Sequence, residues 1–178
     1  PPRLSNRLNT IAARYRESAS RRTLGYFWLI FCLGLNVAVL GPTLPTLAAQ
    51  TGSPIGDMGR IFLLSSIGGT LGTLYGGRLY DRFRGHRVLG AAQIAAGILL
   101  GCVPFAPALS WLLVLMAIKG MMDGVVNNGA NTLLIWTHRD KVAPYMNGLH
   151  FFFGLGAFLS PLLMAQVIET PGAYRVVF

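Results

Sequence analysis

Residues 110–136 form an apolar stretch that contains a stripe of polar side chains, and this stripe is where the sequence could carry chemistry. Lys119 and Asp123 are one helical turn apart, and Asn127 and Asn131 continue the same face at the next two turns. If this stretch crosses a bilayer as a helix, Asp123 lies about 20 Å from either end, near the midplane. An ionisable side chain at that depth is costly and indicates a substrate or proton site. The alternative is structural, with Lys119 and Asp123 neutralising each other and holding helices together.

Three further polar residues fall within apolar stretches. Asn147 and His150 are about one turn apart in residues 143–168, and Asn36 is the comparable amide in residues 24–48. His150 could relay protons or bind a ligand, or it could be a packing residue with a single hydrogen bond among aromatic neighbours. The candidate substrate- or ion-binding residues are therefore Asn36, Lys119, Asp123, Asn127, Asn131, Asn147 and His150.

Other kinds of chemistry find no support in the sequence. It contains no phosphate-binding loop, no cysteines with metal-ligand spacing and no Ser-His-Asp set outside the apolar stretches. Cys32 and Cys102 both fall inside apolar stretches and are interpreted as small core residues. We therefore predict no enzyme activity, no metal site and no cofactor. The sequence leaves open a lipid or pigment held between helices.

The composition indicates a membrane protein. The chain is 53% hydrophobic and only 12% charged, yet its formal net charge is +9, whereas soluble domains carry about 25% charged residues. A nucleic-acid-binding protein would need its basic residues spread over a folded face. Here uncharged stretches confine them to the links, so we predict no nucleic-acid partner.

Five apolar stretches are each close to the roughly 20 residues that cross a bilayer. We place these spans at about 24–48, 58–80, 87–106, 110–136 and 143–168. The links at 107–109 and 137–142 are short, so the helices that they join must be antiparallel. The expected fold class is an all-α membrane protein with about five transmembrane helices.

Glycine and proline spacing adds two expectations. Gly68, Gly72 and Gly76 recur every four residues, and Gly97 and Gly101 share that spacing, so both sets predict faces on which helix backbones approach closely. The sequence Gly41-Pro42 with Pro45 predicts a break near the far end of the first span, which membrane helices tolerate when neighbours satisfy the freed carbonyls.

Residues 1–23 form a basic tail ahead of a membrane region at 24–178. Leu4, Leu8, Ile11 and Tyr15 recur at helical spacing, which predicts an interfacial helix with its arginines toward lipid phosphates; the alternative is a solvated tail. Most arginines and lysines lie in this tail and in the links after the second and fourth spans, so the amino terminus is expected in the cytoplasm. We see no cleavable signal peptide. The expected location is a bacterial inner or plasma membrane, or a specialised photosynthetic membrane.

The link after the second span, GGRLYDRFRGHRVL, resembles the GxxxDRxGRR-like signature between helices two and three of the major facilitator superfamily of transporters. The matching residues are Gly77, Asp81, Arg82, Gly85 and Arg87, with Arg84-Gly85 in place of the usual Gly-Arg order. As plain membrane-surface anchors, these arginines need no further role. The resemblance implies that they form a charge latch for the outward-facing state.

The fourth and fifth spans look like the fucose and sodium-dependent glucose branch of this superfamily. This likeness covers most of residues 76–161 and is carried by Asp123-Gly124, Asn127, Gly129, Asn131-Thr132-Leu133, Pro144-Tyr145-Met146-Asn147, Leu149-His150-Phe151, Gly154-Leu155-Gly156-Ala157 and Ser160-Pro161. It implies a transporter of two six-helix halves with substrate between them. In that branch acidic residues of spans one and four serve the proton and the sugar. Here span four has Asp123, whereas span one offers only Asn36.

Two hypotheses follow, because five spans make an incomplete six-helix half and residues 172–178 look like the lead-in to a sixth span. In the first, the chain is the amino-terminal portion of a secondary transporter that moves a sugar or similar small polar solute, with a cation or proton, by alternating access. Its partner is then the missing carboxy-terminal half. In the second, a truncated relative docks as a structural subunit in a larger respiratory or photosynthetic membrane complex and transports nothing. Membrane lipids are partners in both.

Overall fold

The computed structural model describes the backbone of residues 2–167 and the side chains of residues 17–166. The expected interfacial side chains of Leu4, Leu8, Ile11 and Tyr15, and the expected lead-in to a sixth span, lie outside the residues described in this way.

The regular structure of the described residues is entirely helical, which confirms the all-α fold class. Three short 3-10 helices, at Ile55–Met58, Val103–Phe105 and Arg139–Lys141, lie in the links. The α-helices are α1 (Pro2–Ala38), α2 (Leu40–Thr51), α3 (Gly59–Arg82), α4 (Gly85–Cys102), α5 (Leu109–His138) and α6 (Ala143–Val167).

Three of the described helical segments are long and apolar enough to cross a membrane, namely Gly85–Phe105, Leu109–Lys141 and Ala143–Gln166. The segments Glu17–Ala38 and Leu40–Thr51, bent by 42° against each other, meet the same criterion together, as one broken span. Helix α3 is of similar length, but serine, threonine and glycine make up much of its middle and lower its hydropathy. These polar residues face a cavity described below.

The break between α1 and α2 lies at Val39, slightly before the proline-rich segment in which it was expected. A proline ring collides with the carbonyl group four residues earlier. For Pro42 that carbonyl belongs to Ala38, the last residue of α1. Thr43 stabilises the bend, because its hydroxyl donates to the carbonyl groups of Val39 (3.0 Å) and Leu40 (2.9 Å).

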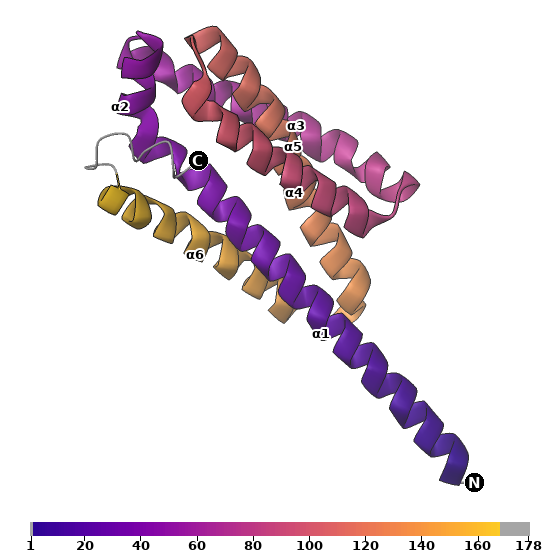
Figure 1. Ribbon diagram of the computed structural model, residues 1–178. Coiled ribbons are helices and arrows are strands. Elements are labelled where there is room, and N and C mark those ends of the chain that lie inside the picture. Colours follow the sequence, from indigo (N-terminus) through magenta and orange to yellow (C-terminus); the bar gives the residue numbers. More distant parts are fainter. Residues whose placement is uncertain (1, 168–178) are drawn as a thin grey trace.

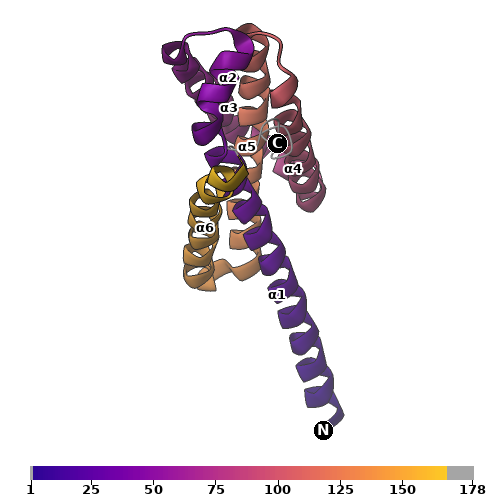
Figure 2. The ribbon, with the colours of Figure 1, turned by 60° about the vertical axis from the view of Figure 1, so that its left-hand side comes forward.

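The helices form two packed groups. Helix α1 lies beside α6, while α3 and α4 both pack on α5, and α1 joins the groups by a further contact with α5. Figure 1 shows these pairs, and Figure 2 shows α4 and α6 on opposite sides of the bundle. The amino-terminal part of α1 extends well beyond the other helices in both views.

Glycines set the spacing within both groups. A methyl group added at Gly68 or Gly72 of α3 would collide with the backbone of Ala117 or Met121 in α5. Gly34 of α1 lies equally close to the α6 backbone. The predicted glycine face of α3 is therefore a close contact with α5, although Gly76 has ordinary van der Waals room. For α4 the prediction was wrong at Gly97, where no described atom lies within 4 Å of an added methyl group.

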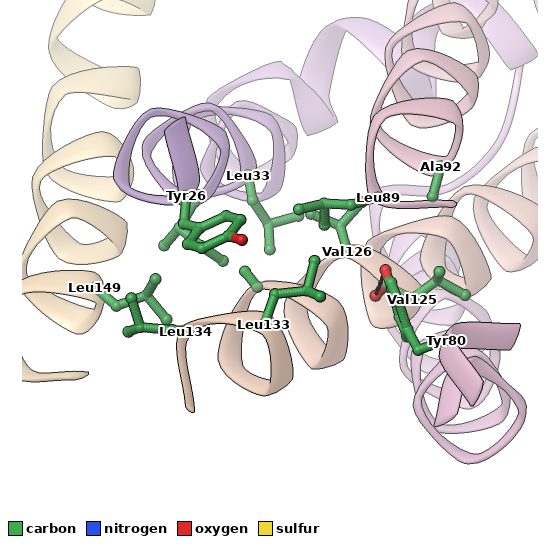
Figure 3. Close-up of a cluster of buried hydrophobic side chains, with 12 residues drawn as sticks. Tyr26, Leu33, Tyr80, Leu89, Ala92, Val125, Val126, Leu133, Leu134 and Leu149 are labelled. Carbon is green, nitrogen blue, oxygen red and sulfur yellow. Dashed lines mark hydrogen bonds between the residues drawn. The ribbon is translucent and has the colours of Figure 1, made fainter. Parts of the chain in front are cut away.

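Two apolar clusters hold the groups together. One is drawn in Figure 3 and includes Tyr26 of α1, Leu89 of α4, Leu133 of α5 and Leu149 of α6. Within it, the Tyr80 hydroxyl donates a 2.9 Å hydrogen bond to the Val125 carbonyl group, so a polar atom of α3 is satisfied by α5. The second cluster lies toward the other end of the bundle, where it includes α2 and the 3-10 helix before α3. Its members are Val39, Leu40, Leu47, Ala48, Met58, Ile61, Leu100, Val103, Ala106, Leu112, Met116 and Met164.

Candidate functional site

A cavity of about 660 Å³ lies between the α1–α6 pair and the α3–α5 pair. Helix α1 contributes apolar side chains to its wall, whereas α3 and α5 contribute most of the polar ones. The described lining residues are Ile30, Leu33, Val37, Ser65, Ser66, Gly69, Thr70, Thr73, Leu74, Gly120, Asp123, Gly124, Asn127, Leu149, His150 and Phe153. Of the seven predicted binding residues, the structure thus brings Asp123, Asn127 and His150 to one cavity.

Asp123 forms an ion pair with Lys119, the pairing that only the structural alternative assumed. The Lys119 ammonium donates to Oδ2 of Asp123 at 2.7 Å, and only 1% of the lysine side chain and 12% of the aspartate side chain are exposed. The other carboxylate oxygen, Oδ1, is buried and has no hydrogen-bond partner among the described residues. Lys119 itself is not among the residues that line the cavity. Asp123 therefore contributes to the cavity wall, whereas its partner Lys119 is buried and does not.

The asparagine stripe reaches the cavity only in part. Asn127 is exposed and lines it, one turn after Asp123. Asn131 does not line it; its amide donates to the Asn127 backbone carbonyl at 2.7 Å. Asn127 is thus the amide of this stripe that is placed to contact a solute.

His150 lies on the cavity wall contributed by α6 and is exposed. No hydrogen bond or ion pair joins it to another described residue, which leaves its ring nitrogens available to a ligand. Asn147 is also exposed but is not among the lining residues, although it is three residues away.

Asn36 lies elsewhere. It borders a separate cavity of about 200 Å³, together with Leu35, Val39, Leu100, Ser160 and Leu163. On α1, the face toward the large cavity carries Ile30, Leu33 and Val37. Helix α1 therefore offers apolar contacts to the large cavity, and Asn36 is not among its lining residues.

The α3 hydroxyl groups were missed by sequence reasoning. Ser66, Thr70 and Thr73 line the cavity at spacings of four and three residues, which place them on one helix face. Thr70 donates to the Ser66 carbonyl (3.0 Å) and Thr73 to the Gly69 carbonyl (2.9 Å). Because each hydroxyl donates within its own helix, its oxygen remains free to accept a hydrogen bond. The spacing of these residues could have predicted a polar face on this helix, but the sequence interpretation considered only its glycines.

The residues of the predicted charge latch lie at and near the link between α3 and α4, and none of them lines the large cavity. They are Gly77, Asp81, Arg82, Gly85 and Arg87. Asp81, Arg82 and Arg87 are all exposed, and neither of the described ion pairs involves them. Gly85 packs against Leu133 of α5, whereas no described atom lies within 4 Å of a methyl group added at Gly77. The Arg82 guanidinium lies over the ring of Phe83 at 5.9 Å, but no described ion pair joins these charges to another helix, and the latch stays a prediction.

Two hydrogen bonds connect this end of the bundle. The Tyr26 hydroxyl of α1 lies 2.9 Å from Nε2 of His86 in α4, and the Thr23 hydroxyl lies 2.6 Å from Nε2 of His138 in α5. The start of α4 and the end of α5 therefore meet the same part of α1, which gathers the predicted cytoplasmic links at one end.

Comparison with known proteins gives the family. The family model described as Major Facilitator Superfamily matches residues 26–178. The chain is 41% identical over 131 residues to the sodium-dependent glucose transporter 1A of Mus musculus, covering 74% of this chain and 31% of that protein. It is 40% identical over 131 residues to the sodium-dependent glucose transporter 1 of Homo sapiens (74% and 25%). It is 32% identical over 143 residues to the major facilitator superfamily domain-containing protein 4A of Homo sapiens (79% and 28%).

No solved structure gives a significant match to the chain. The chain spans less than a third of the length of these curated relatives. The family that the motifs indicate is confirmed, and proteins named for its sodium-dependent glucose branch are among the similar ones. This chain is an integral membrane protein that belongs to the Major Facilitator Superfamily.

Proposed function

We propose that this chain is the amino-terminal portion of a secondary transporter that moves a sugar or similar small polar solute by alternating access. The observation that carries the proposal is the cavity of about 660 Å³, whose wall combines the Asp123 carboxylate, the Asn127 amide, His150 and the α3 hydroxyl groups. Family membership and the names of the relatives support it. A cavity between two helix pairs is also a common place for a ligand site.

The wall suits a solute that carries many hydroxyl groups. Asp123 and Thr70 can accept hydrogen bonds from such a solute, and the Asn127 amide can both donate and accept. Ile30, Leu33 and Phe153 offer apolar surface on the opposite side. A sugar ring presents hydroxyl groups at its edge and C–H groups on its faces, so it can use both kinds of wall.

Sodium is the coupling ion that we favour, because several relatives are named sodium-dependent glucose transporters. An acidic pair across spans one and four would favour a proton instead, but α1 offers no carboxylate to the cavity. Asp123 is the acidic residue of the described cavity wall. A cation that binds Asp123 must reach the buried Oδ1 atom, which has no described hydrogen-bond partner, or displace Lys119 from Oδ2.

The orientation that we propose places the amino terminus in the cytoplasm. Arg21, Arg22, Arg82 and Arg139 belong to the end of the bundle joined by the two histidine hydrogen bonds. At the other end Arg60 is paired with Asp57 at 3.1 Å. An excess of basic residues marks the cytoplasmic side of a membrane protein.

Uptake of radiolabelled D-glucose into liposomes that contain the full-length protein tests this proposal, with sodium or choline outside. We expect sodium-dependent uptake and a fall of about 10- to 100-fold with Asp123→Asn, because a hydrogen bond to a charged group is lost. Asp57→Asn is the matched control, since that carboxylate lies outside the cavity. Normal uptake by Asp123→Asn would remove Asp123 from the site.

The structural-subunit hypothesis predicts a different result from the same preparation. Extraction in mild detergent would then yield the chain in fixed stoichiometry with other membrane subunits. Liposomes containing the purified protein would show no uptake of D-glucose above protein-free liposomes, with or without sodium.

A further inference from the structure

The Lys119–Asp123 pair is placed asymmetrically relative to the cavity. Asp123 lines the wall, whereas Lys119 lies behind it and is one of the most buried large side chains of the described residues, with 1% exposed. Its ammonium is nevertheless 2.7 Å from Oδ2 of Asp123. A solute in the cavity would thus lie beside Asp123 and experience the electric field of Lys119 without contacting the lysine.

The charge balance of the wall depends on this pair. Asp123 is the one lining residue among those described that carries a formal charge, and His150 of α6 is the other ionisable one. The lining residues of α1 are aliphatic, and those of α3 are serine, threonine, glycine and leucine. Without Lys119 the wall would therefore be anionic, and with it the wall is close to neutral.

We propose that Lys119 determines the charge specificity of the cavity. Because the buried Lys119 ammonium neutralises the charge of Asp123, the cavity accepts neutral, hydroxyl-rich solutes and discriminates against charged analogues of the same size. The inference rests on the proposed function and names the property of that site that selects its substrate. It assigns Lys119 a specificity role through Asp123, with no contact between Lys119 and the solute.

Removing one charge should change selectivity in a defined direction. At an effective dielectric constant of about 20, an uncompensated unit charge roughly 6 to 12 Å from a charged solute changes binding by about 10- to 100-fold, and a closer charge changes it more. Lys119→Met should therefore favour a cationic solute, and Asp123→Asn an anionic one. For a neutral solute, either substitution alters only the hydrogen bonds in the cavity. A change in selectivity between charged solutes therefore distinguishes a specificity role of Lys119 from a purely structural role in packing.

The experiment measures binding to the purified full-length protein. D-Glucose, D-glucosamine and D-glucuronate are three sugars of similar shape that are neutral, cationic and anionic at pH 7. Each is titrated while the melting temperature is followed, because a ligand that binds the folded state raises it. Sodium chloride at a fixed concentration supplies the proposed coupling ion and holds the ionic strength constant, and His150→Gln shows whether the other ionisable wall residue contributes to selectivity.

In the wild type we expect both charged sugars to bind more weakly than D-glucose. Lys119→Met should shift the ratio of the two charged-sugar affinities toward D-glucosamine by about tenfold or more, and Asp123→Asn should shift it toward D-glucuronate. Lys119→Arg should keep the wild-type ratio. An unchanged ratio in both single neutralising variants would overturn the inference.

The double variant Lys119→Met/Asp123→Asn guards against misfolding, because leaving one partner of a buried ion pair unpaired is strongly destabilising. The double variant has no net charge at the pair, so it should keep the wild-type ratio of the two charged-sugar affinities. A shift of this ratio toward either charged sugar would count against the specificity role of Lys119. If the wild type neither binds nor transports D-glucose, the proposed substrate class is wrong. Lys119→Met must even then bind D-glucosamine more tightly than D-glucuronate, or this inference is wrong too.

Discussion

Gly124 of α5 lies directly against Gly69 of α3, so close that a methyl group on Gly124 would collide with the Gly69 carbonyl group. Both glycines also line the large cavity. The contact that holds α3 to α5 is thus part of the wall that carries Asp123. We predict that Gly124→Ala lowers the free energy of unfolding by about 1–3 kcal/mol, as overpacking usually does, and that it lowers the melting temperature in detergent.

Gly97→Ala is the matched control for this prediction. Gly97 also lies inside a helix, but no described atom is within 4 Å of an added methyl group. There the higher helix propensity of alanine should leave stability unchanged or raise it by up to about 1 kcal/mol. Equal melting temperatures for the two variants would show that the α3–α5 backbones are not in close contact.

Arg139, at the end of α5, has φ 48° and ψ −122°, and it is the one non-glycine residue with positive φ among the described residues. These angles match the first central position of a type II′ turn, which favours glycine. Arg139→Gly should therefore raise stability by about 1 kcal/mol or more, since strained backbone of this kind costs about 1–3 kcal/mol.

Lys141→Gly supplies the comparison in the same 3-10 helix, because its φ is not positive. Glycine there relieves no strain and adds freedom to the unfolded chain, so stability should fall. Chemical denaturation of both variants in detergent checks the sign of each change. A loss of stability in Arg139→Gly would contradict the strained geometry.

The fold class was predictable because composition and apolar length report directly on helices that cross a membrane. Which helices pack against each other was harder to predict from the sequence. Glycine spacing showed which face of α3 is small, but spacing along one helix says nothing about what lies opposite. The same spacing at Gly97 therefore suggested a contact that the described structure does not contain.

The site was predictable to the extent that charge stands out in an apolar helix. Asp123 and Asn127 were singled out in this way, and both line the cavity. The hydroxyl groups of Thr70 and Thr73 did not stand out, because each satisfies itself on its own helix backbone and costs little in an apolar setting. The rotation of α1 about its axis, which separates Asn36 from the cavity, depends on packing against α6 that no local pattern reports.

Thr70 gives a test of the α3 wall. Its oxygen lines the cavity and already donates its hydrogen to the Ser66 carbonyl group, so Thr70→Val removes an acceptor while keeping the shape. We expect the KM for D-glucose uptake to rise about 2- to 10-fold, the value of one neutral hydrogen bond. Thr51→Val removes a similar hydroxyl, bonded to the Leu47 carbonyl at 2.8 Å, outside the lining residues and should leave KM unchanged. Equal KM values for both variants would place the solute away from α3.

His150 and Asn36 test which faces of α6 and α1 meet the solute. In a background in which Cys32, Cys102 and every cysteine of the rest of the full-length protein are replaced by alanine, single cysteines at these two positions are treated with a membrane-impermeant methanethiosulfonate reagent. His150→Cys should react, because this position is exposed on the wall of the large cavity, and D-glucose should slow the reaction. Asn36→Cys, which borders the separate cavity of about 200 Å³, should react at a rate that D-glucose does not change. Protection at position 36 and none at position 150 would mean that the solute binds on the other face of α1.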